Sequence, residues 1–409
     1  MPESAPSAPS APSSHRTARG AVLGLLLAGG LVIAWLARPG ALPVLLPSGI
    51  TTDEYDAVCA ERRMQGGPAP PPADVLLEIA RKAVAEGAPE KAIAALRGIP
   101  TSDPARGLAA RAEEGRLLLQ QNRAVEAERV LKEFLARSAA QSSLSPAERG
   151  PSYNQLVYLL SVELRLEDRK PWLEEMHRLG IADVYDSKML FFPQLLLWHP
   201  TSGSVRLAEF LKHDPESLTL RTAAARYNLF GGHPEPARQQ LVSLRNEHPQ
   251  DVRVAAALGE CLFEADDWTG IDELIPSLPP PADTDPWSLT HLRGQRALHQ
   301  RQWEEALSLF QSGLRQDPAA SAMVAGESKA LERLQKTAEH AAALERTLEL
   351  SRIRIRLAQV NEHDPDASEG LAEACRRIHF DEAARVFHAH AVRLRAAPRS
   401  KPAPKGPTP

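Results

Sequence analysis

A residue pattern that recurs about every 34 residues constrains this chain of 409 residues more than any other feature. In the clearest unit, residues 287–318, Gly294 is followed twelve residues later by Ala306 and four residues after that by Phe310. Small residues allow two helices to cross closely, and a large residue fills the space toward the next unit. Pro318 closes the unit because proline cannot continue a helix. The pattern therefore predicts paired helices stacked in a series.

The same spacing places further units along the chain. The residues that occupy the same position in successive recognisable second helices are 35, 110, 34, 35 and 77 residues apart. The two longer intervals leave room for additional pairs. We expect two degenerate pairs within residues 150–217, and one more pair made of residues 320–335 and a long helix at about 337–360. This predicts about nine helix pairs over residues 73–396. The key second-helix positions, alanine in every unit except one, fall at Ala92, Ala127, Ala237, Ile271, Ala306 and Ala383.

This spacing resembles that of the tetratricopeptide repeat (TPR) family, although most units lack the family's large aromatic residues in the first helix. Related helical-repeat subtypes therefore stay open. The resemblance implies an all-α, right-handed α-solenoid whose first helices line a concave surface that binds peptides or helices of other proteins. The same surface positions also suit ordinary solvated side chains. Carried over unit by unit, the expected partner-binding residues are Arg116, Arg226, Arg253, Glu260, His291, Gln295 and His299.

An apolar segment near the N-terminus predicts a membrane anchor. Residues 20–37 carry no charge and, as a helix, would span about 27 Å, close to the thickness of a bilayer's hydrocarbon core. We expect a single transmembrane helix that acts as an uncleaved signal anchor; a cleaved signal peptide and a buried helix are the alternatives. Basic residues before the segment and acidic residues after it favour a C-terminal domain exported to the periplasmic side.

The segments outside the helical region are rich in proline, glycine and small residues. Residues 1–19 and the basic, proline-rich residues 397–409 are expected to be disordered tails, and residues 38–72 a linker with room for one short helix at 52–64. The basic C-terminal tail suits solubility better than contact with lipid or nucleic acid. The formal net charge of −4 gives no general attraction for nucleic acid.

The sequence carries no motif for catalysis, a cofactor or a metal ion: HExxH, a P-loop, GxSxG and an EF-hand loop are all absent. Its cysteines, Cys59, Cys261 and Cys375, have no CxxC spacing, and the last two are expected to be buried free thiols. His388 and His390 project from different sides of a helix. The acidic residues beside Trp268, namely Glu264, Asp266 and Asp267, fit a solvated turn between paired helices better than an active site.

These observations favour a non-enzymatic scaffold or adaptor, anchored to a membrane through residues 20–37, that binds other proteins. Envelope assembly or secretion would suit such a protein. Two alternatives stay open: a regulatory repeat domain that faces the cytoplasm, and a non-catalytic subunit that positions the substrate of an enzyme complex. The sequence leaves the oligomeric state undetermined, because the long helix at 337–360 suits either a cap of the array or a dimerisation surface.

Overall fold

The computed structural model describes residues 72–101, 103, 106–141, 144–191, 200–282, 285–359 and 364–396. The chain divides into two compact units, Met1–Pro43 and Val44–Pro409, and every described residue belongs to the second. The predicted N-terminal tail, the anchor at 20–37, almost all of the linker and the C-terminal tail lie outside the described residues. Among the helices that are described, none is long and apolar enough to cross a bilayer.

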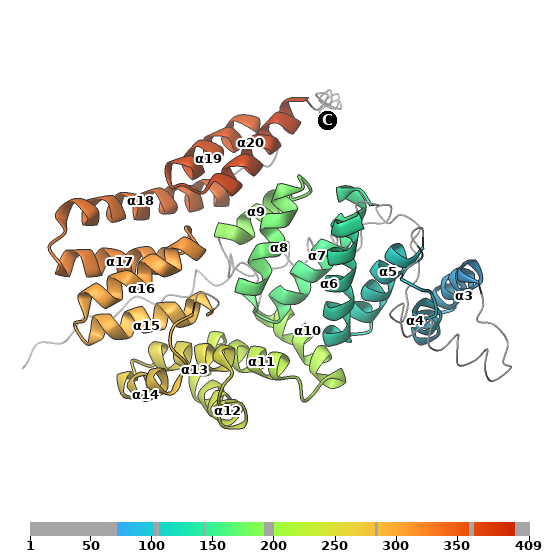
Figure 1. Cartoon of the computed structure of the whole chain (residues 1–409), viewed down its shortest axis with the longest axis horizontal. Coiled ribbons are helices and arrows are strands. Elements are labelled where there is room, and N and C mark those ends of the chain that lie inside the picture. The colour runs from blue at the N-terminus through green and yellow to red at the C-terminus, as the bar shows by residue number, and fades with distance from the viewer. Residues whose placement is uncertain are drawn as a thin grey trace, which may run out of the picture. The chain divides into compact units, whose positions relative to one another are not determined.

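Consecutive α-helices make up the described part of the chain, which contains no β-strand (Figure 1). The predicted all-α repeat fold is confirmed. The pairs in chain order are α3 (Ala73–Ala85) with α4 (Pro89–Arg97), α5 (Gly107–Gln120) with α6 (Ala124–Gln141), α7 (Pro146–Val162) with α8 (Leu166–Arg178), α11 (Leu218–Phe230) with α12 (Pro234–Glu247), α13 (Val252–Glu264) with α14 (Trp268–Leu274), α15 (Trp287–His299) with α16 (Trp303–Gln316), α17 (Ser321–Arg333) with α18 (Thr337–Gln359), and α19 (Pro365–Arg377) with α20 (Asp381–Ala396); the 3₁₀ turn η2 (Ile275–Ser277) follows α14. Between α8 and α11 lie α9 (Val184–Phe191), which packs on α8 and α20, and α10 (Pro200–His213), which packs on α7 and α11.

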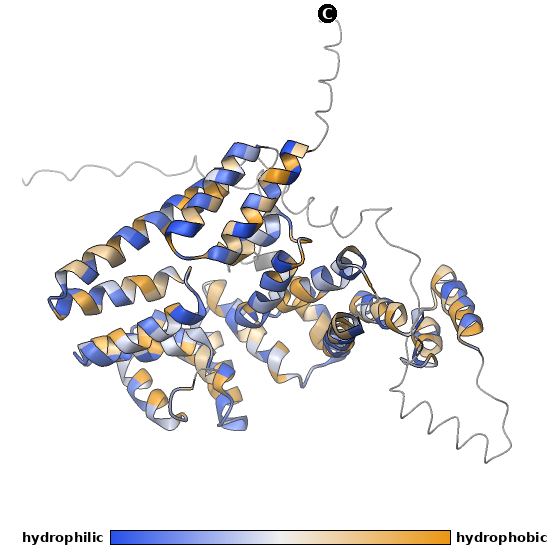
Figure 2. Ribbon diagram, turned by 45° about the horizontal axis from the view of Figure 1, so that its top comes forward, coloured by the Kyte–Doolittle hydropathy of each residue, from blue (hydrophilic) through white to orange (hydrophobic). Residues whose placement is uncertain are grey.

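The small residues of the repeat lie where the helices of a pair cross. All six predicted second-helix positions, from Ala92 to Ala383, are fully buried. A Cβ atom on Gly294 of α15 would come within 2.7 Å of the Phe310 ring of α16, and one on Gly115 of α5 within 2.7 Å of the Leu131 side chain of α6. Close crossing excludes water from the contact, so the pairs build a continuous core. Figure 2 shows the resulting amphipathic helices, with hydrophobic and hydrophilic residues on different sides.

The turns within the pairs share one backbone geometry. One residue adopts a left-handed conformation, and the next amide donates a hydrogen bond to the carbonyl five residues earlier, as from Gln302 to Ala297 at 2.8 Å. This bond satisfies a carbonyl that the end of a helix leaves free. The left-handed residues are Gly87, Asn122, Leu164, Gly232, Asp266, Arg301, Gln335 and His379. The acidic cluster beside Trp268 lies at such a turn, as predicted, and Asp267 caps α14 by accepting from the Gly270 amide.

Helix α9 departs from the repeat and connects distant parts of the chain. α9 has only eight residues and packs against α20. The Phe191 ring lies 5.2 Å from Phe380 and 6.3 Å from Phe387, and the Arg393 guanidinium donates to the Gly180 carbonyl at 3.1 Å. The C-terminal pair therefore packs on a segment about 190 residues earlier in the chain, a contact that a strictly nearest-neighbour array lacks.

Candidate functional site

Three predicted residues lie on one face of α15 at intervals of four residues, because four residues are close to one helical turn. The side chains of His291 and Gln295 are hydrogen-bonded, with 3.0 Å between their nitrogen atoms. The exposed His299 ring stacks on the Trp268 indole at the start of α14, with 4.1 Å between the ring centroids and 6° between the planes. The structure therefore brings these three predicted residues together with an aromatic side chain from the preceding pair.

The His291 imidazole lies at the centre of an aromatic cluster. Its ring centroid is 5.9 Å from Phe263 of α13, 6.4 Å from Trp287 and 6.1 Å from Phe310. Burial, assisted by the charge of Lys329, lowers the pKa of His291 to about 4. A neutral ring at physiological pH offers hydrogen bonding without a charge. We call Phe263, Trp268, His291, Gln295 and His299 together the α13–α15 surface.

Two other predicted residues form an ion pair with each other. The Arg226 guanidinium of α11 donates to both carboxylate oxygens of Glu260 of α13, each at 3.0 Å. The same guanidinium also donates to the Leu164 carbonyl at 2.6 Å. Leu164 is the left-handed residue of the turn between α7 and α8, so a distant turn of the same chain lies against this ion pair.

The first turn of α8, next to this turn, contacts the starts of α13 and α15. Asp168 accepts from the Arg253 guanidinium at 2.9 Å. Glu167 accepts from the backbone amides of Trp287 and Ser288, both at 3.1 Å, and from the Ser288 hydroxyl at 2.8 Å. Burial raises the pKa of Glu167, and the Ser288 bonds partly oppose that shift. This carboxylate caps the α15 N-terminus, where amides without helical partners favour an acceptor.

The seventh predicted residue lies apart from the others. Arg116 of α5 donates to the neighbouring Glu113 carboxylate at 2.6 Å, within its own helix. The sequence also gave no indication of the roles of Leu164, Glu167 and Asp168. Their only signal was the pair of adjacent acidic residues in a segment without a clear repeat pattern, which does not identify a contact more than 80 residues away.

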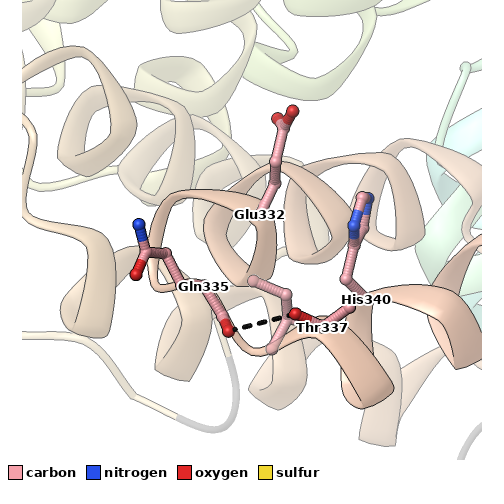
Figure 3. A pocket seen from close by; sticks show the side chains of 5 residues that line it. Glu332, Gln335, Thr337 and His340 are labelled. Atoms are coloured by element: carbon pink, nitrogen blue, oxygen red, sulfur yellow. Dashed lines mark hydrogen bonds between the residues drawn. The ribbon is translucent and has the colours of Figure 1, made fainter.

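Two shallow pockets lie elsewhere in the described part. The larger, of about 420 Å³, sits at the α17–α18 turn and is lined by Leu331, Glu332, Gln335, Thr337 and His340 (Figure 3). Within this pocket the Thr337 hydroxyl donates a hydrogen bond to the Gln335 carbonyl at 3.4 Å, which stabilises the turn itself (Figure 3). The smaller, of about 230 Å³, lies between the proline-rich loop after η2 and helices α15 and α16.

Residues suited to metal or redox chemistry are dispersed within the described ranges. No three His, Cys, Asp or Glu side chains gather there as a metal site would require. Cys261 and Cys375 are buried free thiols, as predicted, and burial raises the pKa of Cys375 to about 12. His388 contacts the Glu369 carboxylate at 2.9 Å.

Comparisons with known proteins find similar folds but no close relative. No family model and no curated protein matches the chain. A TPR protein from Parabacteroides merdae is 16% identical over 63% of this chain and 98% of its own, with a TM-score of 0.32. A chain of the APC/C assembly Cut9-Hcn1 is 11% identical over 71% of this chain and 54% of its own, with a TM-score of 0.37. Pseudomonas aeruginosa pilF is 14% identical over 53% of this chain and 93% of its own, with a TM-score of 0.32. Helical-repeat TPR proteins are thus among the structural neighbours.

Proposed function

We propose that this chain is a TPR-like scaffold that binds segments of other proteins on its α13–α15 surface. One observation carries the proposal: helices α11, α13 and α15 already bind a polypeptide segment of the same chain, namely the α7–α8 turn with the first turn of α8. They do so with an arginine–aspartate ion pair, a capped helix start and a bond to a main-chain carbonyl. Contacts of the same kind allow a protein surface to recognise an acidic peptide segment of another protein, through its carboxylates and its main-chain carbonyls.

The adjoining part of the surface has the composition of a binding site. Trp268 and His299 stack on each other while remaining partly open to solvent, and Gln295 supplies hydrogen-bonding groups between them and His291. Aromatic side chains contribute large contact areas with little loss of side-chain entropy, and they are frequent among the residues that dominate binding energy. We therefore place the partner on His291, Gln295 and His299, next to the bound turn.

The proposal includes attachment to a membrane through residues 20–37, with the repeat unit on the exported side. The uncharged length of the segment and the basic residues before it support this part. A scaffold attached to the exported side of the membrane would be suited to envelope assembly or secretion. A reporter enzyme that is active only outside the cytoplasm, fused after Pro409, is expected to be active; activity only of a cytoplasmic reporter would favour the regulatory alternative.

The binding surface is tested by crosslinking the tagged full-length protein in cells and identifying its partners in the membrane fraction. The test variant combines Gln295→Ala with His299→Ala, because both side chains lie on the surface and neither fills the core. The control is His213→Ala, an exposed histidine at the end of α10. Arg226 and Arg253 are unsuitable test positions, since both stabilise contacts within the chain.

We expect the double variant to lose up to about 90% of the crosslinked partner, as the loss of about 1.4 kcal/mol of binding energy implies for a partner below saturation. The control is expected to keep it. Equal recovery of the same partners by the wild type and the double variant would reject the α13–α15 surface as the binding site.

A further inference from the structure

Helix α18 carries an exposed apolar stripe that the repeat does not explain. It has 23 residues, whereas the corresponding second helices α12 and α16 have 14 each. Leu344 is 46% exposed, and Leu348 and Ile355 are each 57% exposed. With Ala341, Ser351 and Ala358, these residues alternate at spacings of three and four, the pattern of positions a and d in a coiled coil.

The stripe lies on the side of α18 that faces away from the core. The core-facing residues Ala343, Leu350, Ile353 and Leu357 are at most 5% exposed. At 100° per residue, the centre of the stripe is rotated by about 145° from these residues. α18 therefore presents two apolar faces, and the repeat array covers only one.

The stripe is self-complementary in an antiparallel arrangement. When a second α18 runs in the opposite direction, a positions meet d positions of the other helix. Leu344 then meets Ile355 of the second copy, Leu348 meets Ser351, and Ala341 meets Ala358. Each pairing occurs twice about one two-fold axis, so the stripe forms six layers with no position left over.

The charges beside the stripe favour the same direction. Glu345 follows Leu344 in the first half of the helix, and Arg352 follows Ser351 in the second half. The Arg352 side chain is 62% exposed, although its guanidinium also contacts the Glu349 carboxylate of its own helix at 3.1 Å. Within the described part of the chain, Glu345 makes no ion pair. In the antiparallel register Glu345 of each copy lies beside Arg352 of the other. In a parallel arrangement e positions face g positions instead, so Glu345 would lie beside His340 and Arg352 beside Thr347, and the attraction between Glu345 and Arg352 would be absent.

We propose that α18 is a self-association surface, on which a second copy of this chain docks through its own α18 in antiparallel orientation. The contact is small, because each copy contributes three large apolar side chains. Stable protein interfaces bury about 1,200–2,000 Å², so two short helices give a reversible dimer with a dissociation constant on the order of micromolar. Such an interface doubles the number of α13–α15 surfaces in one particle.

The first experiment is sedimentation equilibrium on the full chain, with the same mild detergent in every sample. The wild type is expected to change from one chain to two as its concentration rises through the micromolar range. Ile355→Asp is expected to remain a single chain. The control is Val205→Asp, because Val205 of α10 is 59% exposed and thus matches Ile355 in exposure. A wild type that stays monomeric up to about 100 µM, or an Ile355→Asp variant with unchanged mass, overturns the proposal.

The second experiment tests the register with reversed charges. Glu345→Arg alone and Arg352→Glu alone are each expected to weaken the dimer by about tenfold or more, because attraction becomes repulsion at two symmetric sites. The double reversal is expected to restore the wild-type dissociation constant to within about threefold. Far-UV circular dichroism confirms folding of each variant. Failure of the double reversal to restore association contradicts the antiparallel pairing of these residues.

Discussion

At the scale of single residues, a non-glycine residue in the left-handed conformation lowers the stability of the folded state. Arg301 has φ of 61° in the α15–α16 turn, a conformation in which its Cβ crowds the backbone. Gly87 has φ of 70° in the α3–α4 turn, where glycine adopts it without that crowding. The two turns make the same hydrogen bond, so they provide a matched pair of positions.

We predict that Arg301→Gly raises the free energy of unfolding by about 1 kcal/mol, since it removes the left-handed strain. Gly87→Ala is expected to lower it by a similar amount. A Cβ at Gly87 meets no atom within 4 Å, so the loss comes from strain in φ and not from a steric contact. Urea denaturation measures both variants, and a loss of stability in Arg301→Gly would contradict the prediction.

A buried histidine in α8 makes stability depend on pH. His177 is 7% exposed, and burial lowers its pKa to about 4 from an ordinary value near 6.5. A lowered pKa in the folded state means that the unfolded chain takes up the proton first. The contribution of His177 is therefore complete above pH 6.5 and is lost as the pH falls toward 4.

We predict that the free energy of unfolding of the wild type falls by up to about 3 kcal/mol more between pH 7 and pH 4 than that of His177→Gln. The glutamine variant is less stable at pH 7 but lacks this proton uptake. Denaturation at several pH values gives the two curves. Parallel curves for the two proteins would show that His177 does not titrate in this way.

At the scale of helices, the close crossing within each pair requires small residues. A methyl group on Gly294 would come within 2.7 Å of the Phe310 ring, which is itself fully buried. Gly370 of α19, by contrast, has no atom within 4 Å of the added carbon. The two glycines thus separate the packing effect of a methyl group from its effect on helix propensity.

We predict that Gly294→Ala lowers the free energy of unfolding by about 1–3 kcal/mol, because it forces the two helices apart. Gly370→Ala is expected to raise it by about 0.5–1 kcal/mol, because alanine favours the helix over glycine. Thermal unfolding of the two variants gives the comparison. Similar shifts in the same direction would contradict close packing at Gly294.

The sequence predicts the helices well because each repeat contacts its neighbours. The spacing that placed Ala92 and Ala383 in second helices also predicted α17 and the long α18. It could not predict that Glu167 caps α15, since that contact depends on rotations accumulated over the intervening pairs. For the same reason, the spacing gave no sign that α9 packs against α20.

At the scale of the whole repeat unit, α8 connects pairs that are distant in sequence. Its Glu167 binds the start of α15, and the Lys170 ammonium donates to the Gln316 carbonyl at the end of α16. Its neighbour α9 packs on α20. Unfolding of one part should therefore influence parts more than 100 residues away, in contrast to an open array.

We predict that Glu167→Ala accelerates amide hydrogen exchange at Trp287 and Ser288, because their amides lose the carboxylate that accepts from them. The expected acceleration is about tenfold, as a cap worth about 1 kcal/mol or more implies. Exchange along α3 and α4 is the internal reference. Unchanged exchange at the start of α15 would contradict the long-range cap.

The central claim, that the α13–α15 surface binds another protein, is tested most directly by a photo-crosslinking amino acid at a single position. It would replace His299 on the surface and, in a separate protein, the exposed His213 of α10. After irradiation in cells, we predict adducts of defined mass from position 299 and none from position 213. Adducts from both positions alike, or from neither, would contradict the claim.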